Sequence, residues 1–244
     1  MARADGRRND ELRPLEFVRG FLPHAEGSCY IKMGRTWVAC TATVEEKVPA
    51  WLKGSGRGWI TAEYSMLPRA TELRSVREST QGRVGGRTHE IQRLIGRALR
   101  SVVDLSALPE LTIILDCDVI RADGGTRVAS INGAFIALYD ALVWLKDRER
   151  ISEVPLDSFV AGVSVGIVDG ELLTDLTYAE DSRAQVDLNL VMTDKSGIVE
   201  VQATAEQHPF ARDDLDSMVA AAEKGVAKII AAQQGVLFGG ISGA

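Results

Sequence analysis

The 244-residue sequence contains few cysteines and shows none of the patterns that pair them. Cys29, Cys40 and Cys117 are odd in number, lie far apart and form no CxxC motif. Cysteines of this kind are typical of a reducing compartment, where they serve as packing residues. We therefore expect three reduced, buried thiols in a cytoplasmic protein.

Histidine is equally scarce, with three residues in the whole chain. His24, His89 and His208 show no metal-ligand spacing and accompany no nucleophile motif. A Ser-His-Asp type of triad has no support in this pattern. We expect all three histidines to be non-catalytic.

Long apolar stretches are also missing. No uninterrupted run approaches the roughly 20 apolar residues that a membrane span requires. Residues 1–14 are rich in Arg, Asp and Asn, unlike a secretory signal. With 45% hydrophobic and 25% charged residues, the composition is that of an ordinary globular domain. We expect a cytoplasmic protein with no membrane association.

Positive charge is in deficit overall, since the formal net charge is −6, but it is unevenly distributed. Residues 51–100 contain ten Lys and Arg against four Glu, a balance of +6, so the rest of the chain carries −12. A basic segment in an acidic chain is typical of a localised phosphate-binding surface. The alternative is that these arginines only form ion pairs on exposed helix faces.

Hydrophobic periodicity predicts strands and helices in a mixed order. Apolar residues from Ile91 to Val103 recur at helical spacing, so a helix is expected at 88–104, and a second one follows residue 125. A last amphipathic helix is expected at 213–233, with Asp213 and Asp214 suiting its N-terminus. Strands are expected at 29–33, 36–44, 111–120, 160–168, 186–192 and 198–203. This order predicts an α+β fold of two similar βα halves in one compact unit.

A glycine-rich turn, ADGGTR at 122–127, joins a predicted buried strand to a helix. The N–H groups at a helix start attract anions, Gly124 and Gly125 permit close approach, and Arg127 offers a fork-shaped cation. Arg87 stands in a similar place, after two glycines at the start of the first helix. The two arginines are candidates for one phosphate clamp. The alternative is an ordinary turn with Thr126 as the N-cap.

Acidic residues at the second predicted pair of strands are candidate metal ligands. Asp187 and Asn189 share one strand face, and an ionised Asp within a strand needs compensation by a cation or a reacting group. Asp181 lies six positions earlier and is able to join them. The alternatives are that Asp187 simply faces water, or that Asp116 and Asp118 take the metal role.

Several long runs carry a family resemblance, in order along almost the whole chain. They are DGR (5–7), ELRP (11–14), WLKGSG (51–56), EY (63–64), MLPRAT (66–71), RTHEIQRLIGR (87–97), DCDV (116–119), ADGGTR (122–127), GAF (133–135) and EDS (180–182). Together they resemble the ribonuclease PH family. Against the usual pattern of that family, Arg121, Val128, Asn132 and Gln207 are departures.

The resemblance implies a fold like domain 2 of ribosomal protein S5, with an N-terminal half at 11–142 and a C-terminal half at 158–225. It implies a homohexamer built as a trimer of dimers that trims the 3′ ends of tRNA precursors and other RNAs with inorganic phosphate as co-substrate. Nucleoside diphosphates are the implied products, and 3′ nucleotide addition is the reverse reaction.

The resemblance also assigns roles to residues. Arg87, Gly125, Thr126 and Arg127 are expected to bind the phosphate. Asp181 and Asp187 are expected to be catalytic and to bind Mg²⁺. Arg69, Arg74 and Arg77 are expected to bind RNA. Two other functions stay open: a non-catalytic RNA-binding ring subunit of the same fold, and a hydrolytic nuclease that uses the same carboxylates with water.

Overall fold

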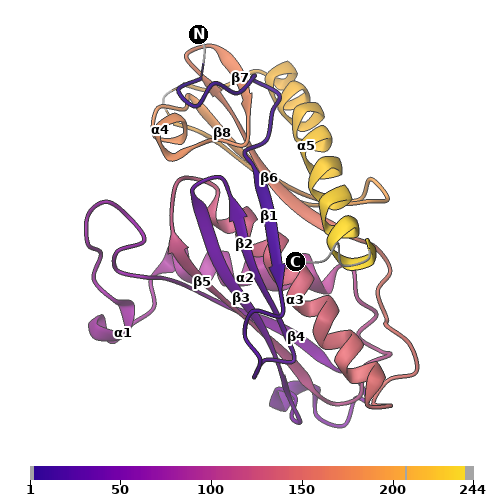
Figure 1. The fold of residues 1–244 in the computed structure, drawn as a ribbon. Coiled ribbons are helices and arrows are strands. Elements are labelled where there is room, and N and C mark those ends of the chain that lie inside the picture. The colour runs from indigo at the N-terminus through magenta and orange to yellow at the C-terminus, as the bar shows by residue number, and fades with distance from the viewer. Residues whose placement is uncertain (1–2, 207, 240–244) are drawn as a thin grey trace.

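A mixed five-stranded sheet forms the first half of the protein in the computed structural model, which describes residues 3–206 and 208–239 (Figure 1). The strand order is β1-β2-β3-β5-β4, and all neighbours are antiparallel except the parallel pair β4 and β5. The strands are β1 (Leu15–Arg19), β2 (Gly27–Met33), β3 (Thr36–Glu45), β4 (Trp59–Met66) and β5 (Thr112–Arg121).

A four-stranded antiparallel sheet forms the second half, in the order β7-β6-β8-β9. Its central strands β6 and β8 are apolar along most of their length, which suits burial on both sides. The strands are β6 (Val160–Val168), β7 (Glu171–Thr174), β8 (Val186–Thr193) and β9 (Ile198–Ala205).

Three long helices pack on these sheets, and the central one touches both. Helix α3 (Thr126–Asp147) contacts β2, β3 and β5 of the first sheet and β6 of the second. Helix α2 (Gly86–Arg100) covers the first sheet beside β4, and α5 (Arg212–Phe238) covers the second (Figure 1). Two single-turn helices, α1 (Glu78–Gln81) and α4 (Tyr178–Asp181), and a 3₁₀ turn (Ala50–Leu52) complete the described elements.

One continuous apolar core runs through both halves, from β2 and β3 across α3 to β6, β8 and α5. Asn132 of α3 joins the halves by two hydrogen bonds to one residue of β6. Its Nδ2 donates to the Gly162 carbonyl at 2.9 Å, and its Oδ1 accepts from the Gly162 N–H at 2.8 Å. The continuous core confirms the predicted α+β fold as one compact unit.

Helix α3 is long and apolar enough to cross a membrane by composition, although Asn132 and Asp140 interrupt its apolar run. Within the protein, 78% of its most apolar window is buried. The sequence pattern is therefore that of a central core helix enclosed by two sheets.

The first predicted helix ends earlier than its apolar stripe. Helix α2 stops at Arg100, although Val102 and Val103 are buried as the stripe requires. Beyond the helix, Val103 forms a β-bridge with Leu156, and the Val102 carbonyl accepts from the Asp157 N–H at 2.8 Å. A distant segment thus takes over the backbone partners of these residues, which single-sequence periodicity does not reveal.

Candidate active site

A pocket of about 430 Å³ opens where the two halves meet. The first half contributes the turn after β5, the start of α3 and the start of α2, and the second half contributes α4, β6, β8 and β9. Its lining includes Arg87, Glu90, Gly124, Gly125, Thr126, Arg127, Asp181, Asp187, Asn189, Gln202, Thr204 and Glu206. The structure therefore brings the predicted phosphate residues and the predicted acidic residues into one cavity.

Two consecutive glycines turn the chain from β5 into α3. Gly124 and Gly125 have φ values of 77° and 64°, in the left-handed region that favours glycine. Gly125 is the N-cap of α3 and Thr126 its first residue, so the alternative of Thr126 as the N-cap is wrong. In the described part of the chain no side chain caps this helix start. Its first N–H groups can therefore bind an anion in the pocket.

The two candidate phosphate arginines both stand at the second residue of a helix. Arg87 follows Gly86 at the start of α2, and Arg127 follows Thr126 at the start of α3. Arg127 is largely buried and donates a hydrogen bond to the side-chain oxygen of Gln202 on β9, with Glu90 of α2 4.0 Å away. Positive charge from two helices thus faces one cavity, as the clamp hypothesis expects.

Thr126 is held in place by a neighbouring tyrosine. The Tyr64 hydroxyl of β4 donates to the Thr126 Oγ1 at 2.9 Å. Burial raises the pKa of Tyr64 above its usual value, so its hydroxyl stays protonated and remains a donor. This contact fixes the side chain at the first position of α3, where an anion would lie.

The two acidic candidates occupy adjoining elements of the second half. Asp181 is the last residue of α4, and Asp187 is the second residue of β8. Asn189 donates to the Asp187 Oδ2 at 3.1 Å, whereas the Asp187 Oδ1 is buried without a hydrogen-bond partner among the described residues. The alternative in which Asp187 simply faces water is therefore wrong for this oxygen.

Both carboxyl groups hold their protons more tightly than usual. Burial, and then the negative charge of Asp181, raise the pKa of Asp187 to about 6, against the opposing effect of Arg127. Burial also raises the pKa of Asp181, although Arg127 and Arg87 partly counteract it. Two interacting carboxyl groups with raised pKa values in a cavity are typical of a site of proton transfer or cation binding.

The acidic pair fits a hard cation. A buried carboxylate oxygen without a partner is costly, and a cation beside it would supply the missing interaction. In residues 3–206 and 208–239, no group of three or more His, Cys, Asp or Glu is arranged to hold a metal. A hard cation held by Asp181 and Asp187 alone would need water or substrate oxygens as its other ligands.

The competing candidates lie elsewhere. Asp116 and Asp118 are on β5, where they pair with Thr41 and Ala39 of β3, and neither lines the pocket. Burial, followed by the charges of Glu63 and Asp118, raises the pKa of Asp116. The three histidines are also absent from the lining of this pocket.

The expected RNA-binding arginines lie on the segment between β4 and α2, which carries α1 and projects from the body (Figure 1). Arg69, Arg74 and Arg77 are all exposed, and none lines the pocket. A groove of about 770 Å³ between this segment and β4 is lined by Arg77, and Arg87 lines both this groove and the pocket. The structure thus connects Arg77 to the site, but Arg69 and Arg74 lie outside both cavities.

Three polar residues of β9 and its end line the cavity and are not among the predicted site residues. Gln202, Thr204 and Glu206 follow one another at two-residue spacing along and just after β9. The pairing of β8 with β9 places Asn189 opposite Gln202 and Asp187 opposite Thr204. The alternation of polar residues along β9 is the sequence signal that could have identified these three residues. Gln207, a departure from the family pattern, lies outside the described residues.

The comparisons with known proteins match this architecture. The model for the 3′ exoribonuclease family, domain 1 (RNase PH) matches residues 11–143, and the model for domain 2 of that family matches residues 158–225. The chain belongs to the 3′ exoribonuclease family. Both RNase PH domains are present, so the resemblance seen in the sequence is confirmed at the level of the family.

Solved structures of the family fold align with nearly the whole chain. Rice (Oryza sativa) Rrp46 aligns at a TM-score of 0.77 with 21% identity, over 96% of this chain and all of that one. A chain of the Archaeoglobus fulgidus exosome with RNA bound to the active site aligns at 0.77 with 22% identity, over 93% and 91%. A chain of an archaeal exosome core aligns at 0.72 with 22% identity, over 95% and 90%. The S5 domain 2-like fold is therefore shared with exosome core proteins.

Proposed function

We propose that this chain is a phosphate-dependent 3′-to-5′ exoribonuclease that shortens the 3′ ends of tRNA precursors and releases nucleoside diphosphates. One observation carries the proposal: two arginines at uncapped helix starts face two carboxyl groups with raised pKa values in a single cavity. A purely structural junction has no need for this combination of opposed charges.

The charges suit a reaction between two anions. Inorganic phosphate, a dianion near neutral pH, must approach an anionic phosphodiester. Arg87, Arg127 and the first N–H groups of α3 offset this repulsion and hold the phosphate in line with the terminal linkage. Attack forms a P–O bond to inorganic phosphate and breaks the P–O3′ bond, which yields a nucleoside diphosphate and an RNA one nucleotide shorter.

Proton transfer falls to the acidic pair. The departing 3′ oxygen needs a proton, and the attacking phosphate loses one. Asp187, whose pKa is raised to about 6, can carry a proton at its carboxyl oxygens near neutral pH. Asp181 is the second carboxylate beside it. When bound, Mg²⁺ would supply further positive charge against the phosphate oxygens.

Assembly and RNA contact extend the proposal. We place RNA along the groove that leads from the cavity to Arg77, with Arg69 and Arg74 as additional phosphate contacts. We propose a homohexamer, a trimer of dimers, as the family resemblance implies, with the exposed Leu73 (82%) and Val76 (53%) of the projecting segment as candidate contacts between subunits. The three cysteines are free and buried, in keeping with a cytoplasmic location.

The test incubates the purified protein with Mg²⁺ and a tRNA that carries a 3′ extension, with and without inorganic phosphate, and identifies the released nucleotides. We expect nucleoside diphosphates only when phosphate is present. Asp187→Asn should abolish this release, whereas Asp118→Asn, a strand aspartate outside the cavity, should not.

Other outcomes would overturn the proposal. Nucleoside monophosphates released without phosphate would indicate a hydrolytic nuclease. RNA binding without any shortening, by a folded and assembled protein, would indicate a non-catalytic ring subunit. The convergence of Arg87, Arg127, Asp181 and Asp187 on one cavity favours the enzyme.

A further inference from the structure

A segment that precedes β1 lies against the second sheet, although β1 itself belongs to the first. We call residues 3–14 the strap. The Thr174 N–H at the end of β7 donates to the Asn9 carbonyl at 2.8 Å, and the indigo start of the chain runs beside β7 in Figure 1. Arg3 and Arg13 of the strap are only 6% and 4% exposed. A buried arginine needs hydrogen-bonding or ionic partners. The partners of Arg3 and Arg13 therefore show which parts of the protein the strap holds.

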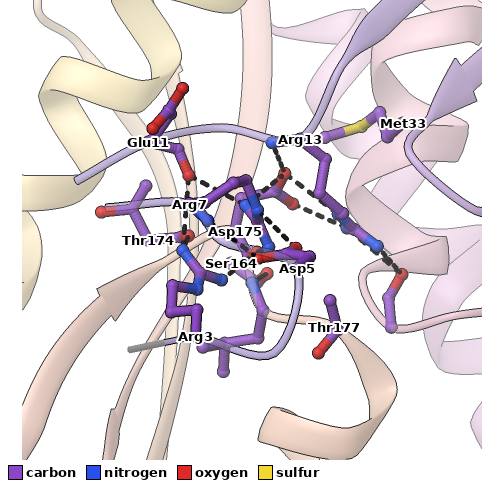
Figure 2. A network of polar contacts seen from close by, with 12 residues as sticks. Arg3, Asp5, Arg7, Glu11, Arg13, Met33, Ser164, Thr174, Asp175 and Thr177 are labelled. Carbon is purple, nitrogen blue, oxygen red and sulfur yellow. Dashed lines mark hydrogen bonds and ion pairs between the residues drawn. The ribbon is translucent and has the colours of Figure 1, made fainter. Parts of the chain in front are cut away.

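Arg13 meets a carboxylate that is completely buried. Its Nε and Nη2 donate to the Asp175 Oδ2 at 3.0 Å and Oδ1 at 2.6 Å, and its backbone N–H donates to Oδ2 at 2.8 Å (Figure 2). Asp175 also has a φ of 57°, which is unusual for a residue with a side chain. Such a conformation persists only where surrounding contacts hold it, and Arg13 supplies three of them.

The same guanidinium reaches the glycine turn that leads into α3. Its Nη1 donates to the Asp123 carbonyl at 2.6 Å and contacts the Gly124 carbonyl at 3.5 Å. Thr36 binds the same turn, because its Oγ1 donates to the Gly124 carbonyl at 2.7 Å and accepts from the Asp123 N–H at 2.9 Å. Arg13 and Thr36 therefore hold the carbonyl groups of Asp123 and Gly124, which directly precede the proposed phosphate site.

The turn also rests against the second half. A Cβ on Gly124 would lie 2.6 Å from the Leu176 carbonyl oxygen, so only glycine fits there. The Tyr178 N–H donates to the Asp123 Oδ1 at 3.3 Å. Asp175 directly precedes Leu176, and Arg13 binds both Asp175 and the Asp123 carbonyl. One arginine therefore holds both sides of this contact between the halves.

Arg3 of the strap binds a carboxylate beside the acidic pair, as Arg13 binds Asp175. It makes two hydrogen bonds to Glu180, at 2.8 and 2.7 Å, and Glu180 caps α4 through the Thr177 N–H at 2.8 Å. Burial alone would raise the pKa of Glu180, but the hydrogen bonds from Arg3 and Thr177 outweigh it and lower the pKa to about 2. Asp181, one of the two proposed catalytic carboxylates, is the next residue.

We infer that Arg13 is a positioning residue for the phosphate, acting with Thr36 and Asp175 to set the shape of the 123–125 turn. Arg13 does not line the pocket, so it does not touch the bound phosphate itself. It acts through the backbone that aims the first N–H groups of α3 at the anion. The inference rests on the proposed function, since it assigns the anion site of the same cavity.

The experiment measures phosphate KM, kcat at saturating phosphate, and binding of inorganic phosphate by calorimetry without RNA. Arg13→Gln should raise phosphate KM by about tenfold or more, because the turn loses its anchor and a misplacement of this kind is costly. Thr36→Val, which removes only the hydroxyl, should raise it by about threefold. Arg13→Lys should not rescue KM, because an ammonium cannot hold Asp175 bidentately and also reach the Asp123 carbonyl.

The matched control is Arg8→Gln, also on the strap. The Arg8 side chain is 74% exposed and pairs with the exposed Asp10, so phosphate KM should not change. Arg13 variants that lose active protein while phosphate KM and phosphate affinity stay at wild-type values would show a merely structural role and overturn the inference. If Arg13 variants do not fold, Thr36→Val decides the matter by the same criteria.

The two proposals fail in different ways. A wild-type protein without phosphorolysis that still binds phosphate, more weakly after Arg13→Gln or Thr36→Val, would refute the enzyme and support the positioning role. A wild-type protein with phosphorolysis and variants with unchanged phosphate KM would refute the positioning role alone. A wild-type protein that binds no inorganic phosphate would refute both.

Discussion

Replacing Asp187 by asparagine should stabilise the protein while it removes activity. The pKa of this carboxyl rises from 3.8 to about 6 on folding, because the group is buried beside Asp181. A shift of about two pH units corresponds to roughly 3 kcal/mol of folding free energy lost when the carboxyl is ionised. Asp187→Asn keeps the shape and removes the charge. The pKa of about 6 already includes the attraction of Arg127, so only the burial of the new amide reduces the gain, and we expect about 1–3 kcal/mol at pH 7.5.

The stability gain from Asp187→Asn should increase as the pH rises. An acid whose pKa is higher in the folded protein binds its proton more tightly there, so folding of the wild type is favoured most below about pH 4. That advantage is lost as the pH rises through 6. The stability difference between Asp187→Asn and wild type should therefore be small near pH 4, grow between pH 4 and 6, and stay constant above pH 6.5.

The assay is urea unfolding of both proteins at equal concentration and at several pH values, without divalent cations. Equal concentration matters because assembly contributes to apparent stability. Asp147→Asn serves as the control, since it removes the same charge at an exposed residue at the end of α3, outside the cavity. A difference that is independent of pH, or an Asp187→Asn protein less stable than wild type at pH 7.5, would refute the reasoning.

Further predictions concern the cation, the phosphate, the RNA and the junction of the two halves. Millimolar Mg²⁺ should raise the Tm of wild type more than that of Asp187→Asn, and equal shifts would count against a site at this carboxylate. Arg127→Ala should raise phosphate KM about tenfold or more, whereas Arg93→Ala on the exposed side of α2 should leave it unchanged in the same assay. Arg74→Ala should weaken RNA binding and lower the slope of log K against log salt by about one without changing phosphate KM, and an unaltered slope would exclude a phosphate contact. Asn132→Ala should cost about 2–3 kcal/mol in urea unfolding, because both Gly162 backbone groups lose their partner, and a cost under 0.5 would contradict that role.

The long periodic elements were predictable from the sequence, because their patterns reflect burial alone. The stripe from Ile91 to Leu99 is buried in α2 as expected, and the last helix spans the predicted region and extends to Phe238. Strands β1, β4 and β7 were not predicted. Strand β4 pairs in parallel with β5, from which it is separated by a whole helix, so its partner is invisible in a local window.

The separate motifs that line the cavity were predictable from the sequence, but their meeting in one cavity was not. The turn at 122–127 and the pair Asp181 and Asp187 have local signals in glycine, charge and alternation. What unites them is the meeting of two halves around α3, which depends on contacts such as that between Asn132 and Gly162. The buried Asp187 oxygen likewise depends on how β9 lies beside β8, and no spacing in the sequence encodes that depth of burial.

The strap also determines the order in which the protein can mature. Arg13 and Asp175 are 162 positions apart, and Arg3 and Glu180 are 177 apart. On the ribosome, β1 to β5 and α3 can therefore form before Asp175 and Glu180, the carboxylate partners of the strap, have been synthesised. Until the second half emerges, these arginines lack their carboxylate partners, and the glycine turn has only its contacts within the first half, such as those with Thr36. Contacts of such long range are formed late, so a nascent chain should acquire its anion site only in the last step of folding.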